Sequence, residues 1–458
     1  MQHPKHYDVF GQETTLAAGP ARDSWDATQM AFMAHGAATG DHLAATVAAA
    51  PDFALGQAVK GMMMLLLGRS ELEPVAREAL AAARAGAPAT AREIAFVRAL
   101  GAWIDDGRPS DAARHLEEVL DQNPTDTLAM KLSHAIRFIL GDARTMRQVL
   151  EAVLPAYAHD HPGRGYLLGC HAFALEETGD YAKAQTTGRI ALGTTSDDAW
   201  GLHAVAHVYD MTGDSRGGIN WLSGHETAWE HCNNFRYHVW WHKALMHLDQ
   251  GEVDTVLDLY DQAIRADHTD DYRDISNATS LLSRLELDGV DVGDRWDELA
   301  TVSEGRTEDG CLIFADLHYL LALIGGGRDG AVRRLMGRMH QNAKASASDM
   351  QKRMAMPGLN AGAGLEAFGE GDYRTAFLNL ARARRNMQIA GGSHAQRDVF
   401  ERLTIDAGIR SGFLDEAEGI LAQRTARRAG REDRYAAVRR DMIVQGRAAA
   451  CADRVPAE

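Results

Sequence analysis

The sequence predicts an all-α fold, built as an α-solenoid of helical hairpins. Segments such as Val75 to Ala85 and Ala376 to Arg385 carry apolar residues at helical spacing, whereas few segments alternate over the length of a strand. Glycines also follow apolar helical segments at a period of roughly 38 residues. Such a period is typical of repeats that bury their apolar faces only by stacking on their neighbours.

Ten glycines mark the predicted turns of these hairpins. Their successive spacings are 39, 34, 38, 34, 38, 38, 38, 44 and 41 residues. Because glycine readily adopts the left-handed backbone conformation that ends a helix, we expect each of them to close the first helix of a repeat. The ten positions are Gly68, Gly107, Gly141, Gly179, Gly213, Gly251, Gly289, Gly327, Gly371 and Gly412.

Two of the predicted hairpins match the tetratricopeptide pattern, in which small alanines lie where the paired helices approach each other. A third is similar, because Gly107 is followed by Ala112 and Pro124. We therefore expect a tetratricopeptide-like α-solenoid that forms one right-handed superhelix. The matching positions are Gly179, Asp180, Tyr181, Ala184 and Ala191 in one hairpin, and Gly371, Asp372, Tyr373, Ala376 and Ala383 in the other.

The pattern predicts three parts in the chain. Residues 1–68 form an N-terminal helical cap, because the helical segment from Trp25 to Ala50 is out of register with the repeats. Residues 69–420 hold the repeats, with a histidine-rich centre at 159–247. Residues 421–458 form a basic helical segment with mixed charges, which we expect to be solvated.

Composition limits the classes of partner. The 458 residues carry a formal charge of −16, which makes a nucleic-acid backbone an unfavourable partner. The four cysteines are far apart and show no CxxC spacing, which is typical of reduced thiols in the cytoplasm. The longest aliphatic run, Met62 to Leu67, is too short to span a bilayer. We expect a cytoplasmic protein that binds neither nucleic acid nor membrane.

Histidines gather in the centre of the chain. Ten of the twenty lie between His159 and His247, a segment of 89 residues. Two pairs stand four residues apart, a spacing that places both rings on one face of a helix. These pairs are His203 with His207 and His238 with His242.

Counting back from the turn glycines places these histidines on one helical stripe. His203 and His207 lie 10 and 6 residues before Gly213, and His238 and His242 lie 13 and 9 before Gly251. His134, His171 and His318 lie 7, 8 and 9 residues before their own turn glycines. All of them belong to the first helix of a repeat, so neighbouring repeats could bring their imidazoles together.

Three interpretations of the histidine band remain open. In the first, the rings only pack between helices; in the second, they bind Zn²⁺ or another divalent transition metal; in the third, they move protons in a polar pocket. Acidic neighbours follow or precede them: Glu176 and Glu177 after His171, Asp210 after His207, and Asp316 before His318. Five of the eight tryptophans crowd the same region, where most would pack and some could wall a ligand pocket.

The ordered set of motifs resembles the tetratricopeptide repeat protein 38 family. The resemblance spans about half the chain and implies a helical repeat fold and a soluble protein, without a settled activity or catalytic residue. The segments that carry it are Phe173–Tyr181, Asp198–Val208, His238–Leu245, Leu259–Asp261, Leu281–Leu287 and Gly391–Asp398.

Two further glycine-containing motifs have simple structural interpretations. Gly325-Gly326-Gly327 lacks the Lys-Ser or Lys-Thr of a phosphate loop and is interpreted as a repeat turn. The segment from Gly391 to Asp398 predicts a helix start, with Ser393 and Gln396 forming a capping box. Contact of His394 or Arg397 with a ligand is a second hypothesis for this segment.

The leading hypothesis is a central His- and Trp-rich pocket for a small organic molecule, with hydrolytic or other acid–base chemistry. The catalytic candidates are His203, His207 and His242, and the metal candidates are His203, His207, His238 and His242. The substrate-binding candidates are His171, Glu176, His238, Trp241, His318, His394 and Arg397.

The alternative hypothesis is a non-catalytic scaffold that holds a peptide or partner protein in its concave groove. Such grooves use basic carboxylate clamps, and a chain of charge −16 shows no obvious one. A homo-oligomer is a further expectation, because solenoids associate through exposed terminal repeats.

Overall fold

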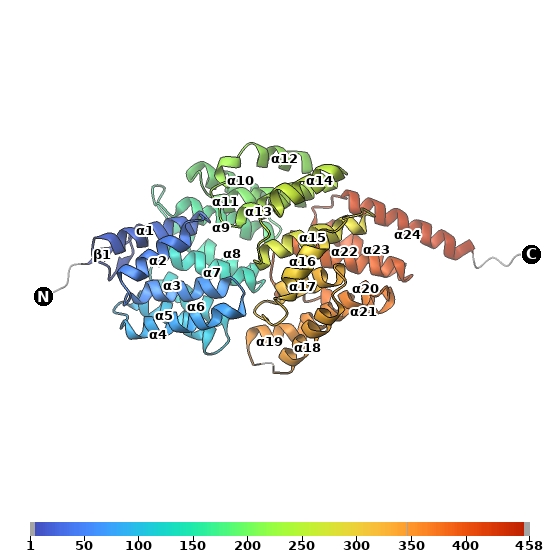
Figure 1. Cartoon of the computed structure of the whole chain (residues 1–458). Coiled ribbons are helices and arrows are strands. Elements are labelled where there is room, and N and C mark those ends of the chain that lie inside the picture. Colours follow the sequence, from blue (N-terminus) through green and yellow to red (C-terminus); the bar gives the residue numbers. More distant parts are fainter. Residues whose placement is uncertain (1–4, 346, 453–458) are drawn as a thin grey trace, which may run out of the picture. The chain divides into compact units, whose positions relative to one another are not determined.

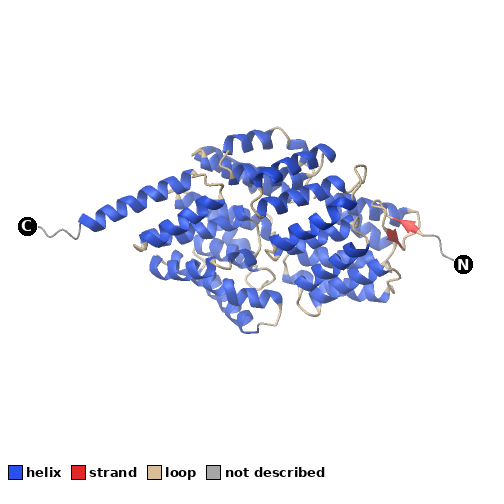
Figure 2. Cartoon of the chain, turned by 180° about the vertical axis from the view of Figure 1, so that it is seen from behind, coloured by secondary structure: helices blue, strands red, loops and turns tan. Residues whose placement is uncertain are grey.

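The computed structural model describes residues 5–345 and 347–452, and most of these residues are helical (Figure 2). In the described part, the strands are β1 (His6–Tyr7) and β2 (Glu13–Thr14), which pair in antiparallel fashion. The prediction of an all-α helical-repeat solenoid is confirmed. None of the helices in the described part combines the length and the apolar character that crossing a bilayer requires.

The chain divides into two compact units. The first comprises Met1–Val205, Gly224–Val239 and Ala347–Met350, and the second Ala206–Ser223, Trp240–Ser346 and Gln351–Glu458. The first unit contains these helices: α1 (Pro20–Met33), α2 (Thr39–Ala49), α3 (Ala54–Leu66), α4 (Glu73–Ala85), α5 (Ala91–Ile104), α6 (Pro109–Gln122), α7 (Thr127–Ile139), α8 (Ala143–Val153), α9 (Arg164–Glu177) and α10 (Tyr181–Thr194).

Helices α11 (Ala199–Met211), α13 (Phe235–Asp249) and α19 (Asp349–Arg353) each run without a break from one unit into the other. The second unit contains these helices, labelled in Figure 1: α12 (Ser215–Ser223), α14 (Val253–Leu259), α15 (Tyr272–Leu287), α16 (Arg295–Glu304), α17 (Ile313–Gly325), α18 (Asp329–Ala345), α20 (Leu359–Gly369), α21 (Tyr373–Arg384), α22 (His394–Arg410), α23 (Leu414–Arg427) and α24 (Arg434–Ala452). The short helical turns are η1 (Ser70–Leu72), η2 (Leu154–Ala156), η3 (Glu226–Ala228), η4 (Tyr260–Ile264), η5 (Met354–Gly358) and η6 (Met387–Ala390).

All ten predicted turn glycines adopt the left-handed conformation, with φ between +63° and +84°. At Gly179 the backbone N–H donates to the carbonyl of Glu176 at 2.8 Å, and the N–H of Asp180 donates to Leu175 at 2.9 Å. These bonds satisfy carbonyls at the end of α9 that have no partner within the helix. The glycine therefore ends the first helix and starts the second, as predicted. Gly327 occupies the same position after α17, which confirms that its glycine run is a repeat turn.

Small residues let the paired helices approach. Ala184 and Ala376 are completely buried, and Ala383 is nearly so. Their helices α10 and α21 pack against α9 and α20, the first helices of the same hairpins. The tetratricopeptide pattern thus marks real helix contacts.

The basic C-terminal segment differs from the expected solvated helix. Arg424 and Arg439 are each only 2% exposed. Arg424 donates to Asp398 on α22 at 2.6 Å and to Asp433 at 2.7 Å. Arg439 on α24 donates to Asp288 at 2.7 Å.

Arg439 also donates to Asp406 on α22 at 3.1 Å, and Asp406 is 1% exposed. A carboxylate this deeply buried requires a cation beside it, because an unpaired buried charge is costly. The prediction of a solvated helix is therefore wrong for these arginines, whose charges are used inside the second unit.

We expect Gly412→Ala to destabilise the protein by about 1 kcal/mol, because an L-residue is strained at the +81° φ of this turn. No atom lies within 4 Å of the added Cβ, so the cost is conformational. Gly419→Ala is the matched control, since Gly419 lies inside α23 with equally open space, and there alanine should stabilise by roughly 0.5–1 kcal/mol. Urea unfolding measures both changes. A Gly412→Ala variant at least as stable as the wild type would contradict the turn assignment.

Candidate functional site

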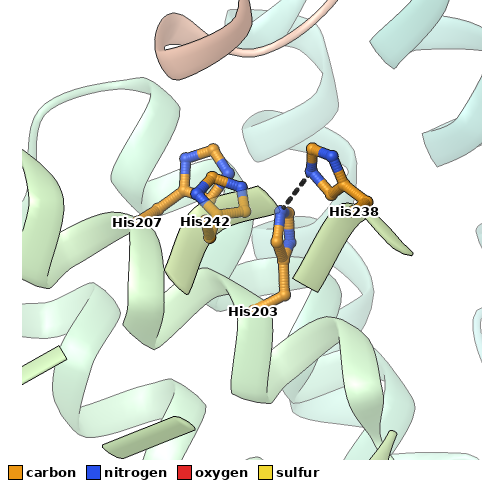
Figure 3. Close-up of side chains that lie close together, drawn as sticks. All are labelled: His203, His207, His238 and His242. Carbon is orange, nitrogen blue, oxygen red and sulfur yellow. Dashed lines mark hydrogen bonds between the residues drawn. The ribbon is translucent and has the colours of Figure 1, made fainter. Parts of the chain in front are cut away.

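Two helices bring the paired histidines together. His203 and His207 lie one turn apart on α11, and His238 and His242 lie one turn apart on α13. Each pair therefore shares one helix face. Figure 3 shows the four rings close together, with a hydrogen bond between His203 and His238.

The rings meet in cross-helix pairs. The Nε2 atoms of His203 and His238 are 2.9 Å apart, and the ring centroids of His207 and His242 are 4.3 Å apart. Each of the four residues offers one ring nitrogen, and these nitrogens all lie within 4.8 Å of one another. The stripe inferred from the turn glycines thus corresponds to a real cluster, which we call the histidine cluster.

Burial differs within the histidine cluster. His203, His207 and His242 are at most 1% exposed, whereas His238 is half-buried. A neutral imidazole buried in this way keeps a lone pair for a metal or a proton. The half-buried ring marks the side of the cluster that is more accessible to solvent.

Two carboxylates extend the histidine cluster. Glu176 and Glu177 end α9, and both are buried. One oxygen from each lies within 4.8 Å of the other and of a ring nitrogen of His207. A carboxylate beside a histidine ligand fixes the orientation of the ring and raises its basicity. His207 therefore belongs both to the group of four histidines and to the group that it forms with Glu176 and Glu177.

The geometry of the histidine cluster fits a transition-metal ion. A tetrahedral Zn²⁺ with nitrogens at about 2.0–2.1 Å places those nitrogens about 3.4 Å from one another. The 2.9 Å separation of one pair and the 4.8 Å limit for the whole set bracket that value. Imidazole ligands suit zinc, copper, nickel and iron. The residues that could hold the metal are the four predicted ones, His203, His207, His238 and His242.

Aromatic rings surround His203. Phe173 stacks on it with centroids 5.7 Å apart, Trp200 is 5.1 Å away, and Phe235 meets it edge-on at 5.2 Å. Such rings exclude water and strengthen electrostatic interactions within the site. Two of the five tryptophans noted in the sequence contact the histidine cluster: Trp200 lies beside His203, and Trp241 meets His242 edge-on with ring centroids 4.8 Å apart.

Lys131 is a functional candidate that the sequence prediction missed. It lies on α7 and is only 3% exposed. Its Nζ donates to Nε2 of His35 at 3.1 Å and lies 5.2 Å from the centre of the Trp200 ring. Within the described residues it forms no ion pair with a carboxylate. A buried ammonium of this kind is suited to binding a negatively charged group.

The position of Lys131 relative to its turn glycine could have identified it from the sequence. It lies 10 residues before Gly141, the same offset that places His203 before Gly213. His134 follows it by three residues and faces Phe173 and Trp200 edge-on. Burial lowers the pKa of His134 well below its ordinary value. Lys131 therefore lies on the same stripe of first-helix positions, two repeats before that of His203.

Asp198 is the second missed residue. It is completely buried, and an alanine Cβ at Gly169 or Gly201 would lie within 2.4 Å of its Oδ2 atom. Two glycines therefore make the space for this carboxyl group. Burial raises the pKa of Asp198 to about 7, against the opposing charge of Lys131.

Several predicted site residues lie outside the histidine cluster. His171 is buried on α9, but its Nε2 is 3.5 Å from Glu151 on α8. His318 on α17 is bonded through Nδ1 to the carbonyl of Phe314 at 2.7 Å, and burial lowers its pKa to about 4. Trp241 is completely buried in a hydrophobic core cluster, and its ring meets that of His242 edge-on at 4.8 Å. The contacts of His171 and His318 are local, whereas Trp241 borders the histidine cluster.

The Gly391–Asp398 segment forms the predicted capping box. The backbone N–H of Gln396 donates to Ser393 Oγ at 3.3 Å, and the N–H of Ser393 donates back to Gln396 Oε1 at 3.0 Å. His394 and Arg397 line a cavity of about 330 Å³ in the second unit, and the histidine cluster does not contribute to its lining.

Two of the expected acidic neighbours are used elsewhere. Asp210 accepts a hydrogen bond from Arg428 at 3.1 Å, and Asp316 accepts one from Arg338 at 2.6 Å. Neither acts as a histidine partner through these contacts. Sequence proximity failed here because each carboxylate points toward an arginine on a different helix.

The fold and the site together define a tetratricopeptide-like helical-repeat protein with a histidine cluster on two first helices. No protein-family model matches the chain. A solved structure, described as the human IFIT1 dimer with PPP-AAAA, is similar at 13% identity with a TM-score of 0.40, covering 94% of this chain and 96% of that chain. A likeness at this level carries no argument about ligands. The expectation that this chain binds no nucleic acid therefore stays a prediction.

We expect Asp198→Asn to change how stability depends on pH. A carboxyl group whose pKa rises from 3.8 to about 7 on folding binds its proton more tightly in the folded state. Its contribution to stability is therefore lost as pH rises through this window, by at most about 4 kcal/mol. Asparagine has no such loss, so the variant should gain stability relative to the wild type between pH 4 and 7. Urea unfolding at several pH values measures the free energy of unfolding of both proteins. The same pH dependence in the wild type and the variant would contradict the prediction.

Proposed function

We propose that this protein binds a divalent transition metal, such as zinc, at His203, His207, His238 and His242, and acts with it on a small organic molecule. The observation that carries the proposal is the approach of four ring nitrogens to within 4.8 Å of one another. Hydrolysis or related acid–base chemistry is the reaction class, because a metal of this kind activates water and polarises a carbonyl group.

The difference in burial supports separate roles for the histidines. Catalytic zinc sites keep one coordination position for water or substrate. His203, His207 and His242 are buried and would hold the metal, while the half-buried His238 would be the replaceable ligand on the side open to substrate. The His238 imidazole, whose Nε2 lies 2.9 Å from Nε2 of His203, would also serve as the general base or acid.

The surroundings supply the remaining functions. Glu176 and Glu177 beside His207 would orient that ligand and accept a proton from a bound water. Trp200 and Phe235 would contact the apolar part of the substrate. Lys131, held by His35 over the Trp200 ring, would bind a negatively charged group of the substrate. A small molecule with both an apolar part and an anionic group fits this set of side chains.

The sequence motifs support the remaining proposals. The ordered segments between Phe173 and Asp398 support membership of the tetratricopeptide repeat protein 38 family. The cytoplasmic location, the three-part division at residues 68 and 420, the single superhelix and a homo-oligomeric state stay predictions. A peptide-binding scaffold remains the alternative function, and metal content separates the two.

We expect the purified protein to carry about one equivalent of transition metal and His207→Ala to lose it, with affinity reduced at least about 100-fold. His247→Ala is the matched control, because His247 lies on α13, the helix of His238 and His242, and contacts Glu252 instead of the histidine cluster. Elemental analysis after dialysis, followed by zinc titration against a competing chelator, measures both. A wild type without metal affinity, or a His207→Ala variant that keeps it, would favour the scaffold.

We expect His238→Ala to retain the metal while losing turnover. Its affinity for zinc should fall by no more than about 10–100-fold, less than that of His207→Ala, because its ring is the replaceable ligand. The measurements are the zinc titration and hydrolysis of a panel of ester and amide substrates by the metal-loaded protein. Equal loss of metal in the two variants would show that His238 is an ordinary structural ligand.

A further inference from the structure

A cavity that is separate from the histidine cluster lies in the second unit. It has a volume of about 330 Å³, within the range of small-molecule pockets. Its walls come from the end of α21, the η6 turn, the first turns of α22, and α23, with Met211 from the end of α11. The polar segment that begins at Gly391 supplies part of this lining through His394, Arg397 and Asp398.

Arginines dominate the lining of this cavity. Six of them face only two lining carboxylates, Asp398 and Glu401, although the chain as a whole has a charge of −16. Two more carboxylates do not line the cavity but form ion pairs with its arginines: Asp433 with Arg424 and Asp210 with Arg428. Six positive charges against four negative ones leave a positive excess. The six are Arg384, Arg385, Arg397, Arg424, Arg427 and Arg428.

Structural ion pairs explain only part of this set. Arg424 and Arg428 are buried and held by carboxylates, so they maintain the fold. Arg384 and Arg427 both donate to one carboxylate, that of Glu401. Arg385 is exposed at the end of α21, and within the described residues it forms no ion pair. Its guanidinium is therefore available to a ligand at the mouth of the cavity.

Part of the remaining lining is apolar. Leu380 and Ala383 of α21, Met387 of η6 and Phe400 of α22 contribute it, and all but Met387 are at most 5% exposed. A bare inorganic ion would leave this surface uncovered. An apolar body would cover it and gain from burial.

We propose that this cavity binds a small organic anion, a molecule with an apolar body and one carboxylate or phosphate group. The anionic group contacts Arg385 and the guanidinium groups around Glu401, and the apolar body lies against Phe400 and Leu380. Arginine forms paired, charge-assisted hydrogen bonds with either group. This site is independent of the metal proposal, because the cavity lining includes none of the four clustered histidines.

The experiment compares probes that share one apolar chain. Isothermal titration calorimetry of the full-length protein at low ionic strength measures binding of hexanoate, hexyl phosphate, hexanol and inorganic phosphate. We expect the two organic anions to bind more tightly than hexanol and than inorganic phosphate. The tighter of the two identifies the anionic group as a carboxylate or a phosphate. Added salt should weaken both anions, because the contact with Arg385 is exposed.

Three variants test the assigned residues. Arg385→Gln should weaken binding of the preferred anion about five- to tenfold, the loss expected for one exposed charge-assisted contact. Glu401→Gln should strengthen binding, because it frees two guanidiniums. Arg382→Gln is the matched control, since Arg382 is exposed on the same helix α21 and does not line the cavity. Thermal unfolding confirms that each variant is folded.

Several results would overturn the proposal. If hexanol bound as tightly as the anions, the charged contact with the arginines would not contribute to binding. If inorganic phosphate bound as tightly as hexyl phosphate, the apolar contact would not contribute. Identical affinities in Arg385→Gln, Glu401→Gln and Arg382→Gln would place the anion elsewhere. Absence of binding by either organic anion would show that the arginines serve the fold alone.

Discussion

The end of each first helix at a left-handed glycine is the constraint on which the rest of this protein depends. Gly213 and Gly251 stop α11 and α13 at set distances beyond their histidine pairs. Because both helices end in the same way, residues at similar offsets face the same side of their repeats. The histidine cluster is therefore a product of helix termination as much as of residue type. A shift of one residue at either turn would rotate a ring by about 100° around its helix.

The sequence supports strong predictions where the information is local. A glycine after an apolar helix predicts a left-handed turn, since few other residues adopt that conformation cheaply, and all ten positions conform. Helix periodicity also predicts that His203 and His207 share one helix face, whereas the contact of His203 with His238 on another helix could not be predicted. Ser393 and Gln396 likewise form their capping box from residues three positions apart.

Contacts between distant helices were beyond such reasoning. His171 lies 8 residues before Gly179, a distance similar to those of the cluster residues from their own turn glycines. Its ring nevertheless lies beside Glu151 on α8. Lys131 looks like any single lysine in an apolar helix until His35, almost one hundred residues earlier, is found beside it. Asp198 requires space left by Gly169, which no spacing rule reveals. Charge pairing at Asp210 and Arg428 is set by tertiary packing in the same way.

Several buried polar side chains lie near Trp200 and the histidine cluster. Lys131, Asp198 and Glu176 are all at most 3% exposed, and burial of such groups opposes folding unless function or pairing compensates. His35 also has a left-handed backbone, with φ of 57°, while its ring stacks 4.6 Å from Phe235. Polar burial and backbone strain together are typical of sites retained for chemistry at some cost in stability.

The buried arginine of α24 joins two helices that are far apart in the sequence. Asp288, directly after α15, and Asp406 on α22 share Arg439 as their common cation. Asp406 is 1% exposed, and an unpaired buried charge is costly, so loss of this one side chain would destabilise the contacts of both helices at once. The second unit therefore unfolds as one body over a long stretch of sequence, because α15, α22 and α24 contribute to the same charge network.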